Sequence, residues 1–288
     1  FQKKVKKYTI DRNIAIFVSV KQIMEVIGYI ASIFIGITLG LIGGGGSILT
    51  VPVLVYLFSV EAVPAAAYSM FIVGLTSIVG SYSYFRNGLV HFKTALIFGI
   101  PSIIAVYLTR AFVVPAIPSE IFTLGSFVLT KGVFLMLLFA FLMIAASYNM
   151  IKSNKNGHGI ADSSHKIYYP VLMIQGAIVG GLTSLVGAGG GFLIIPALVL
   201  LSKLHMKEAI GTSLLIIAIN STIGFLSESS STYFDWKLLL SVSGFAIFGI
   251  IIGLMLSKKI EGSKLKPAFG WFVLLMGVYI IIKETILK

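Results

Sequence analysis

The sequence LIGGGGSILTVPVLV at residues 41–55 recurs as LVGAGGGFLIIPALV at residues 185–199, 144 residues further along the chain. Eight of the fifteen aligned positions are identical, and these include three glycines and one proline. Serine, glycine and lysine identities continue at the same offset as far as Lys93 and Lys237. Matches of these residue types are uncommon by chance in an apolar chain, so the sequence predicts an internal duplication.

The composition places both copies in a membrane. Of the 288 residues, 57% are hydrophobic and 11% are charged, and the mean hydropathy is +1.01. Soluble proteins carry about 25% charged residues, and a soluble fold of this size has too little interior to bury so much apolar surface. The composition therefore excludes a soluble enzyme and a disordered chain. A secreted disulfide scaffold is excluded too, because the chain has no cysteine.

Apolar runs long enough to cross a bilayer are separated by polar turns. The runs cover residues 26–58, 64–85, 94–114, 131–151, 169–202, 209–227, 238–257 and 267–283. We therefore predict an all-α polytopic membrane protein with two homologous repeats. Each repeat has one glycine-broken helix, kinked or re-entrant, and three further helices. The transmembrane repeats are placed at residues 26–151 and 169–288, and the polar linker 152–168 joins them.

Residues 1–25 contain six lysines and arginines, which favour a basic amphipathic arm, cytoplasmic or interfacial, near anionic lipid rather than a nucleic-acid site. Because residue 1 is a phenylalanine, we expect further residues to precede it. The count of basic residues favours a cytoplasmic N-terminus if every run crosses once. It shows no preference if each broken run turns back at its glycines. The sequence thus leaves parallel and inverted repeats both open.

The glycine clusters are the strongest candidates for a binding site. Four consecutive glycines, Gly43 to Gly46, do not make a stable helix interior, because each costs about 1 kcal/mol relative to alanine. Irregular backbone at membrane depth is tolerated where it is buried in protein or lines a wet cavity. An apolar helix is expected to begin after each cluster, so that free N–H groups and the positive end of a helix dipole bind an anion. The alternative is that the glycines only let helices pack closely.

Hydroxyl and amide side chains lie within the helices that follow the clusters, at spacings that put them on one helix face. We expect them to complete the hydrogen-bond shell of an oxyanion, although such side chains commonly bond to a backbone carbonyl or to a neighbouring helix. Pro52 and Pro196 are expected to kink or open the helix after each cluster. The predicted ligands are Gly43, Gly44, Gly45, Gly46, Ser47, Gly187, Ala188, Gly189, Gly190, Gly191, Ser69, Thr76, Ser77, Thr212, Ser213, Asn220 and Ser221.

The charged residues lie at the ends of the apolar runs. Lys93 and Lys237 stand at helix starts, where they either attract anions to a vestibule or snorkel to the interface, and Arg110 is expected to snorkel as well. All ten acidic residues lie at or near run ends, which leaves no mid-helix carboxylate to carry protons or bind sodium. The four histidines lack metal-ligand spacing. We therefore expect no metal, no cofactor and no catalytic set of residues, and hence no enzyme.

The chain resembles the TauE/SafE sulfite exporter family in its duplicated GGGGS and GAGGGF segments, in EAIGTS at residues 208–213 and in DWK at residues 235–237. The resemblance extends over nearly the whole chain from about residue 26. It implies transport of sulfite, sulfonates or related sulfur oxyanions, usually outward, across a prokaryotic inner membrane. PAAAYS at residues 64–69 and HFK at residues 91–93 depart from the pattern of the family.

The sequence and the resemblance together predict a transporter that holds a small oxyanion between the two glycine-broken half-helices and exports sulfite. Access would alternate by rocking one repeat against the other. An anion that leaves a cell with a negative interior gains about 2.3 kcal/mol per charge per 100 mV, so export needs no coupling ion. The alternatives are a passive anion channel, an uptake permease for sulfonates or thiosulfate, and a membrane enzyme or assembly subunit. The sequence leaves the oligomeric state open.

Overall fold

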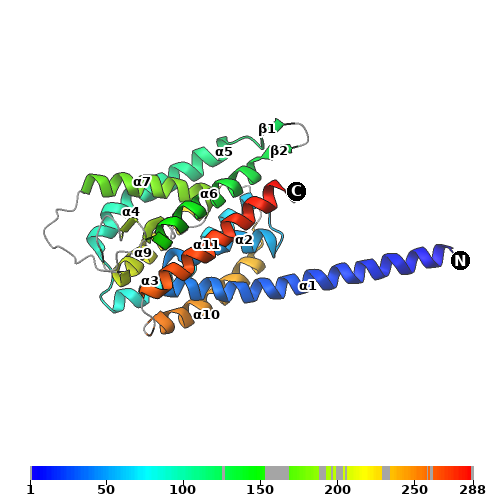
Figure 1. Ribbon diagram of the computed structural model, residues 1–288, viewed down its shortest axis with the longest axis horizontal. Coiled ribbons are helices and arrows are strands. Elements are labelled where there is room, and N and C mark those ends of the chain that lie inside the picture. The colour runs from blue at the N-terminus through cyan, green and yellow to red at the C-terminus, as the bar shows by residue number, and fades with distance from the viewer. Residues whose placement is uncertain are drawn as a thin grey trace.

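The computed structural model describes residues 2–124, 127–152, 169–187, 193–195, 197–198, 204, 206–228, 234–257, 259 and 262–286. The helices form one bundle, from which the N-terminal part of α1 projects (Figure 1). In the described part of the chain, seven helices are long and apolar enough to cross a membrane. The predicted all-α polytopic class is therefore confirmed.

The first broken helix consists of α1 (Gln2–Ile42), the short 3₁₀-helix η1 (Gly44–Gly46) and α2 (Ser47–Tyr56). Gly43 joins α1 to η1 with a φ of 77°, a left-handed conformation that glycine adopts without steric cost. This turn ends α1 and allows a new helix to begin at Ser47, immediately after the glycines.

The remaining long helices coincide with the other apolar runs. They are α3 (Ala62–Arg86), α4 (Phe92–Leu108), α6 (Lys131–Lys152), α7 (Tyr169–Val186), α9 (Met206–Leu226), α10 (Trp236–Ser257) and α11 (Gly262–Thr285). Helix α4 continues through the π-helix η2 (Thr109–Val113) into the single turn α5 (Val114–Ala116). A short antiparallel hairpin, β1 (Glu120–Leu124) and β2 (Phe127–Thr130), then leads to α6. This hairpin is a local addition to the predicted all-helical fold.

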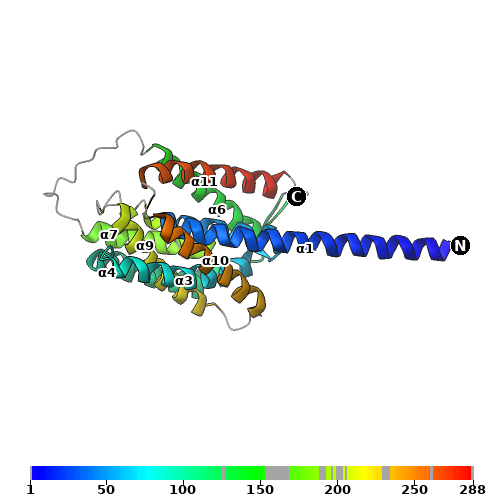
Figure 2. The same cartoon turned by 90° about the horizontal axis from the view of Figure 1, so that it is seen from below.

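The predicted basic arm is continuous with the first membrane helix. Helix α1 runs unbroken from Gln2 to Ile42, and Figure 2 shows its N-terminal part extending beyond the other helices. At 1.5 Å per residue, its length is about 60 Å, roughly twice the hydrocarbon thickness of a bilayer. The interfacial role of this segment stays a prediction, and the predicted linker lies outside the described residues beyond Lys152.

Helices α1 and α10 lie side by side, and so do α7 and α4, because glycines let their backbones approach. An added Cβ on any of four glycines would lie within 2.7 Å of a backbone carbonyl oxygen of the neighbouring helix. The contacts are Gly36 with Ala246 and Gly40 with Ile250, then Gly176 with Phe98 and Gly180 with Ser102. Residue numbers rise together in both pairs, so each pair is parallel.

Helices α3 and α9 are antiparallel. Gly74 lies against Ser221, whereas Tyr84, further along α3, lies against the earlier residue Gly211 of α9. Two further pairs are parallel, α10 with α3 and α4 with α9. Between α3 and α10, Tyr68 contacts Asp235 and Gly80 contacts Ile250. Between α4 and α9, Ser102 contacts Asn220 and Arg110 contacts Glu228.

The helices that the 144-residue offset pairs therefore run in opposite directions. These pairs are α1 with α7, α3 with α9, and α4 with α10. This is the packing expected of inverted repeats, while the duplication itself stays a prediction from the sequence.

Inverted packing predicts which loops share a membrane face. The chain contains no cysteine, so Asn87→Cys, Lys259→Cys and Ser119→Cys each introduce a single exposed thiol. We expect a membrane-impermeant thiol reagent to label residues 87 and 259 from the same side and residue 119 from the other. If each broken run crossed the membrane once, residues 87 and 259 would lie on opposite sides, and opposite labelling would contradict the packing described here.

Candidate functional site

The predicted polar side chains lie along the antiparallel α3–α9 pair and are all buried. The seven hydroxyl and amide side chains are at most 2% exposed. Those nearest the middle of the pair are Thr76, Ser77, Asn220 and Ser221, which we call the central polar cluster. Because Gly74 lies against Ser221, these four residues lie within about one helical turn of one another along the pair. Thr76 and Asn220 are offset partners, as are Ser77 and Ser221.

The hydroxyl groups along this pair differ in whether they have a hydrogen-bond partner. Thr76 donates to the carbonyl of Ile72 at 2.6 Å, which is the ordinary bonding of a helical threonine. The hydroxyls of Ser69, Ser77 and Ser221 have no hydrogen-bond partner among the described residues. A buried polar group without a partner costs about 1–3 kcal/mol, so a ligand that bonds to these three hydroxyls would recover that cost, and their role as ligands stays a prediction.

Asn220 also has unused hydrogen-bonding capacity. Its Nδ2 donates to the Ser102 hydroxyl at 2.6 Å, whereas its Oδ1 has no partner in the described part of the chain. A cavity of about 80 Å³ between α4 and α9 reaches this side chain, and its remaining lining is apolar or glycine, Phe92 and Leu215 among it. Asn220 is therefore the polar end of an otherwise apolar pocket, which opens beside the exposed side chains of Leu96, Ile100 and Ile219.

The first glycine break lies against the opposite half of the chain. An added Cβ on Gly43 would lie 3.0 Å from the Ser213 hydroxyl oxygen and 3.1 Å from Ile210, both on α9. No described side chain caps the N-terminus of η1 or of α2. Ser47 N–H at the start of α2 donates to the carbonyl of Gly44. The first N–H groups of a helix have no partner within that helix, so the backbone donors expected close to Ser213 are those of η1.

Two residues of this segment, Gly46 and Ser47, already make close contacts within the same half of the chain. Ser47, predicted as a ligand, donates its hydroxyl to the carbonyl of Gly44 at 2.7 Å. An added Cβ on Gly46 would lie 2.3 Å from the carbonyl oxygen of Ile35, so close packing on α1 requires glycine there. The packing interpretation of the glycines therefore holds at Gly46. Helix α2 is continuous through Pro52.

The second glycine break has the same geometry at Gly187. Its φ is also 77°, and an added Cβ would lie 2.3 Å from the Cβ of Ala66 on α3. Ala66 is the offset partner of Ile210, which contacts Gly43, so each break contacts the corresponding helix of the other half. The other predicted residues of this segment lie outside the described residues, namely Ala188, Gly189, Gly190, Gly191 and Pro196.

The two breaks lie on opposite sides of the central polar cluster. Gly43 contacts α9 at Ser213, seven residues before Asn220, and Gly187 contacts α3 at Ala66, ten residues before Thr76. At 1.5 Å per residue the breaks lie about 10 Å and about 15 Å from the cluster, in opposite directions. Each long helix, α1 and α7, therefore passes the level of the cluster before its glycine turn, and the two turns lie apart. The expectation of one anion held between both helix N-termini stays a prediction, because residues 188–192 after the second turn lie outside the described residues.

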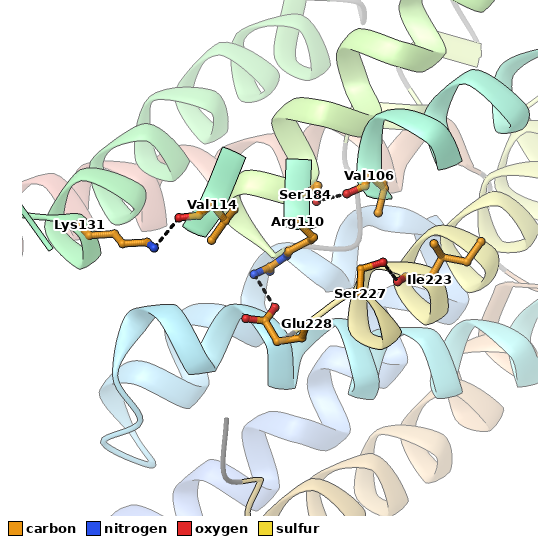
Figure 3. A network of polar contacts seen from close by, with 8 residues as sticks. All are labelled: Val106, Arg110, Val114, Lys131, Ser184, Ile223, Ser227 and Glu228. Atoms are coloured by element: carbon orange, nitrogen blue, oxygen red, sulfur yellow. Dashed lines mark hydrogen bonds and ion pairs between the residues drawn. The ribbon is translucent and has the colours of Figure 1, made fainter. Parts of the chain in front are cut away.

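A buried ion pair joins α4 to the end of α9. Arg110 Nη1 lies 3.0 Å from Glu228 Oε2, and the arginine side chain is 1% exposed. Figure 3 shows the guanidinium group pointing from the end of α4 toward Glu228. The expectation that Arg110 snorkels to the interface is therefore wrong. Its partner is 118 residues away in sequence, so no local pattern indicated the pair.

The two lysines predicted to line a vestibule are both exposed. The ammonium group of Lys93 lies 4.9 Å from the centre of the Tyr169 ring, a cation–π contact between α4 and α7. A vestibule role for Lys93 and Lys237 stays a prediction. The residues that the structure describes include no group of three or more His, Asp or Glu side chains able to hold a metal ion.

Comparison with known proteins agrees with this architecture. The family model described as sulfite exporter TauE/SafE matches residues 29–280. The chain belongs to the TauE/SafE sulfite exporter family. Together with the membrane-spanning helices, this makes the protein an integral, multi-pass membrane transporter rather than an enzyme.

Relatives of this TauE/SafE family member carry general names. A probable membrane transporter protein of Bacillus subtilis (strain 168), YunE, is 30% identical over 275 residues, which cover 90% of this chain and 96% of the relative. A probable membrane transporter protein of Xylella fastidiosa (strain 9a5c) is 26% identical over 261 residues, covering 86% and 91%. Another from Methanocaldococcus jannaschii is 26% identical over 284 residues, covering 92% and 97%. No solved structure matches the chain.

The two segments that depart from the TauE/SafE pattern are residues 64–69 and 91–93. Each forms the same hydrogen bond with the other half of the chain. Asp235 N–H donates to the Tyr68 hydroxyl at 2.7 Å, and His91 N–H donates to the Thr212 hydroxyl at 2.9 Å. Asp235 and Thr212 are the offset partners of His91 and Tyr68. The donor is a backbone group in both bonds, so this bond does not depend on whether histidine or aspartate stands there, and the tyrosine hydroxyl takes the place of the threonine hydroxyl. The cap bond that Asp235 Oδ1 accepts from Leu238 N–H has no counterpart in the His91 side chain.

Proposed function

We propose that this TauE/SafE family transporter exports sulfite along the α3–α9 pair. The anion occupies three positions in turn. One is the helix N-terminus after Gly43, beside Ser213, and the second is the central polar cluster. The third is the turn at Gly187, which contacts Ala66 one helical turn from Ser69, the offset partner of Ser213. Each position offers backbone N–H or hydroxyl donors, which suit the oxygen atoms of sulfite.

The observation that carries the proposal is the pair of unpartnered hydroxyls at Ser77 and Ser221. Both are fully buried offset partners from opposite halves, and neither has a hydrogen-bond partner among the described residues. A structural serine in a membrane helix normally bonds to a carbonyl or across a helix interface. Free hydroxyl donors buried in the membrane favour a ligand that carries hydrogen-bond acceptors. Such a ligand is bound here without a cationic side chain beside it.

The opposed directions of the two halves support alternating access. Helices α1, α3 and α10 run one way and α4, α7 and α9 the other, so rocking one half against the other exposes the central polar cluster to each face in turn. The central cluster contains no carboxylate, which suits an uncoupled anion that leaves the cell along the membrane potential.

The proposal is tested by sulfite flux from liposomes that contain the purified protein. The membrane potential is clamped, and the proton gradient is varied separately. We expect a saturable flux that follows the potential and is indifferent to the proton gradient, with empty liposomes as the control. A flux proportional to sulfite concentration without saturation would indicate a channel. A flux driven by the proton gradient would indicate coupled uptake. Absence of flux for sulfite, thiosulfate and sulfonates would overturn the substrate class.

A further inference from the structure

The two ends of the α3–α9 pair differ in chemistry although the helices correspond. The offset partners of Arg110 and Glu228 are Leu254 and Tyr84. One end therefore carries a buried ion pair, whereas the other carries a leucine and a tyrosine whose hydroxyl donates to the carbonyl of Gly40 at 3.3 Å. The ion pair is an addition to one end, and the packing shared by both halves does not require it.

Arg110 lies at the level of the second glycine break. Helices α4 and α7 are parallel, and Ser184 on α7 donates to the carbonyl of Val106 on α4 at 3.2 Å (Figure 3). One turn further along each helix, α4 reaches Arg110 and α7 ends at Gly187. The guanidinium group thus belongs to the end of the pair where Gly187 turns the chain.

The guanidinium group has hydrogen-bond donors to spare. Arg110 is 3% exposed as a residue, and its Nε and Nη2 have no partner in the described ranges, while Nη1 bonds to Glu228. An arginine has five N–H donors in a planar fork that matches an oxyanion. Arg110 also sits in the π-helix η2, a distortion that is frequent at functional sites.

We propose that Arg110 binds the transported oxyanion at this end of the path and that Glu228 is the competitor the anion displaces. With no anion bound, the ion pair closes the end. An arriving oxyanion accepts from the free Nε and Nη2 donors as a bidentate ligand, and its negative charge repels Glu228, which is 13% exposed and moves to water. The inference rests on the proposed function only in requiring that the substrate is an oxyanion.

The test measures sulfite binding to the full-length protein in detergent at constant ionic strength. Glu228→Gln removes the competitor and is expected to tighten binding about tenfold, the usual effect of one charge-assisted hydrogen bond. The double variant R110Q/E228Q leaves no unpaired charge and is expected to weaken binding at least about tenfold relative to wild type. Arg86→Gln, which removes an exposed arginine at the end of α3, serves as the matched control with unchanged affinity.

The exchanged pair R110E/E228R separates binding from structural support. It restores an ion pair between the same helices, so thermal stability is expected to recover, while sulfite binding stays as weak as in R110Q/E228Q. Wild-type affinity in both the exchanged pair and R110Q/E228Q would show a purely structural ion pair and overturn this inference alone. If wild-type protein binds neither sulfite nor thiosulfate, the proposed function fails and this inference fails with it.

Discussion

Gly187→Ala is expected to abolish sulfite flux and to destabilise the protein. An added Cβ at this position would lie 2.3 Å from the Cβ of Ala66 and 2.6 Å from its backbone oxygen, so α7 must move away from α3. The φ of 77° adds a backbone cost of about 1–2 kcal/mol to about 1–3 kcal/mol for overpacking. The sum is about 2–5 kcal/mol, and we expect flux in liposomes to fall below about a tenth of wild type.

Two other glycines separate the two costs. Gly88 has a φ of 69° but nothing within 4 Å of an added Cβ, so Gly88→Ala measures the backbone cost alone. Gly244 has neither a positive φ nor a close neighbour, so Gly244→Ala is expected to be neutral. Flux and melting temperature of Gly187→Ala equal to those of Gly88→Ala would show that the contact with Ala66 does not matter.

The double variant Ser77→Ala and Ser221→Ala is expected to raise the Kd for sulfite by about a hundredfold or more. A hydrogen bond to a charged ligand contributes about 1.5–3 kcal/mol, and the variant removes two. Stability should stay unchanged or rise, because neither hydroxyl has a partner among the described residues whose bond would be lost. Sulfite binding and thermal unfolding of the same preparation measure both effects.

Ser81→Ala is the matched control for the serine variants. Ser81 lies on α3 one turn beyond Ser77 and is buried, but its hydroxyl donates to the carbonyl of Ile78 at 3.0 Å. We expect this substitution to leave the Kd for sulfite unchanged. A double variant at Ser77 and Ser221 that binds sulfite as wild type does, or that unfolds at a lower temperature, would mean that these hydroxyls only hold helices together.

Much of the fold could be predicted because it follows from local patterns. Apolar runs bounded by polar turns placed the membrane helices, and the glycines at 43–46 placed the start of α2 at Ser47. Helical spacing also indicated that Ser69, Thr76 and Ser77 share one face. All three are buried, on a helix that packs against α9.

The remaining features depend on contacts that are distant in sequence. Whether the halves are parallel or inverted depends on pairings such as Gly74 with Ser221, which the count of basic residues does not report. Arg110 lies near the end of an apolar run and looked like a snorkelling side chain, because Glu228 comes from another helix. The separation of the turns at Gly43 and Gly187 required knowing how far α1 and α7 extend before they end.

The difference between Arg110 and its offset partner Leu254 bears on the resting state of the transporter. In a protein with two identical inverted halves, the states open to either face would have equal free energy, because exchanging the halves converts one state into the other. In the proposed cycle, opening the Arg110 end has to separate the buried ion pair with Glu228, whereas the other end carries Leu254 and Tyr84 at the corresponding positions. Separating a buried ion pair costs free energy, so we expect the empty protein to rest closed at the Arg110 end and to face the other side of the membrane.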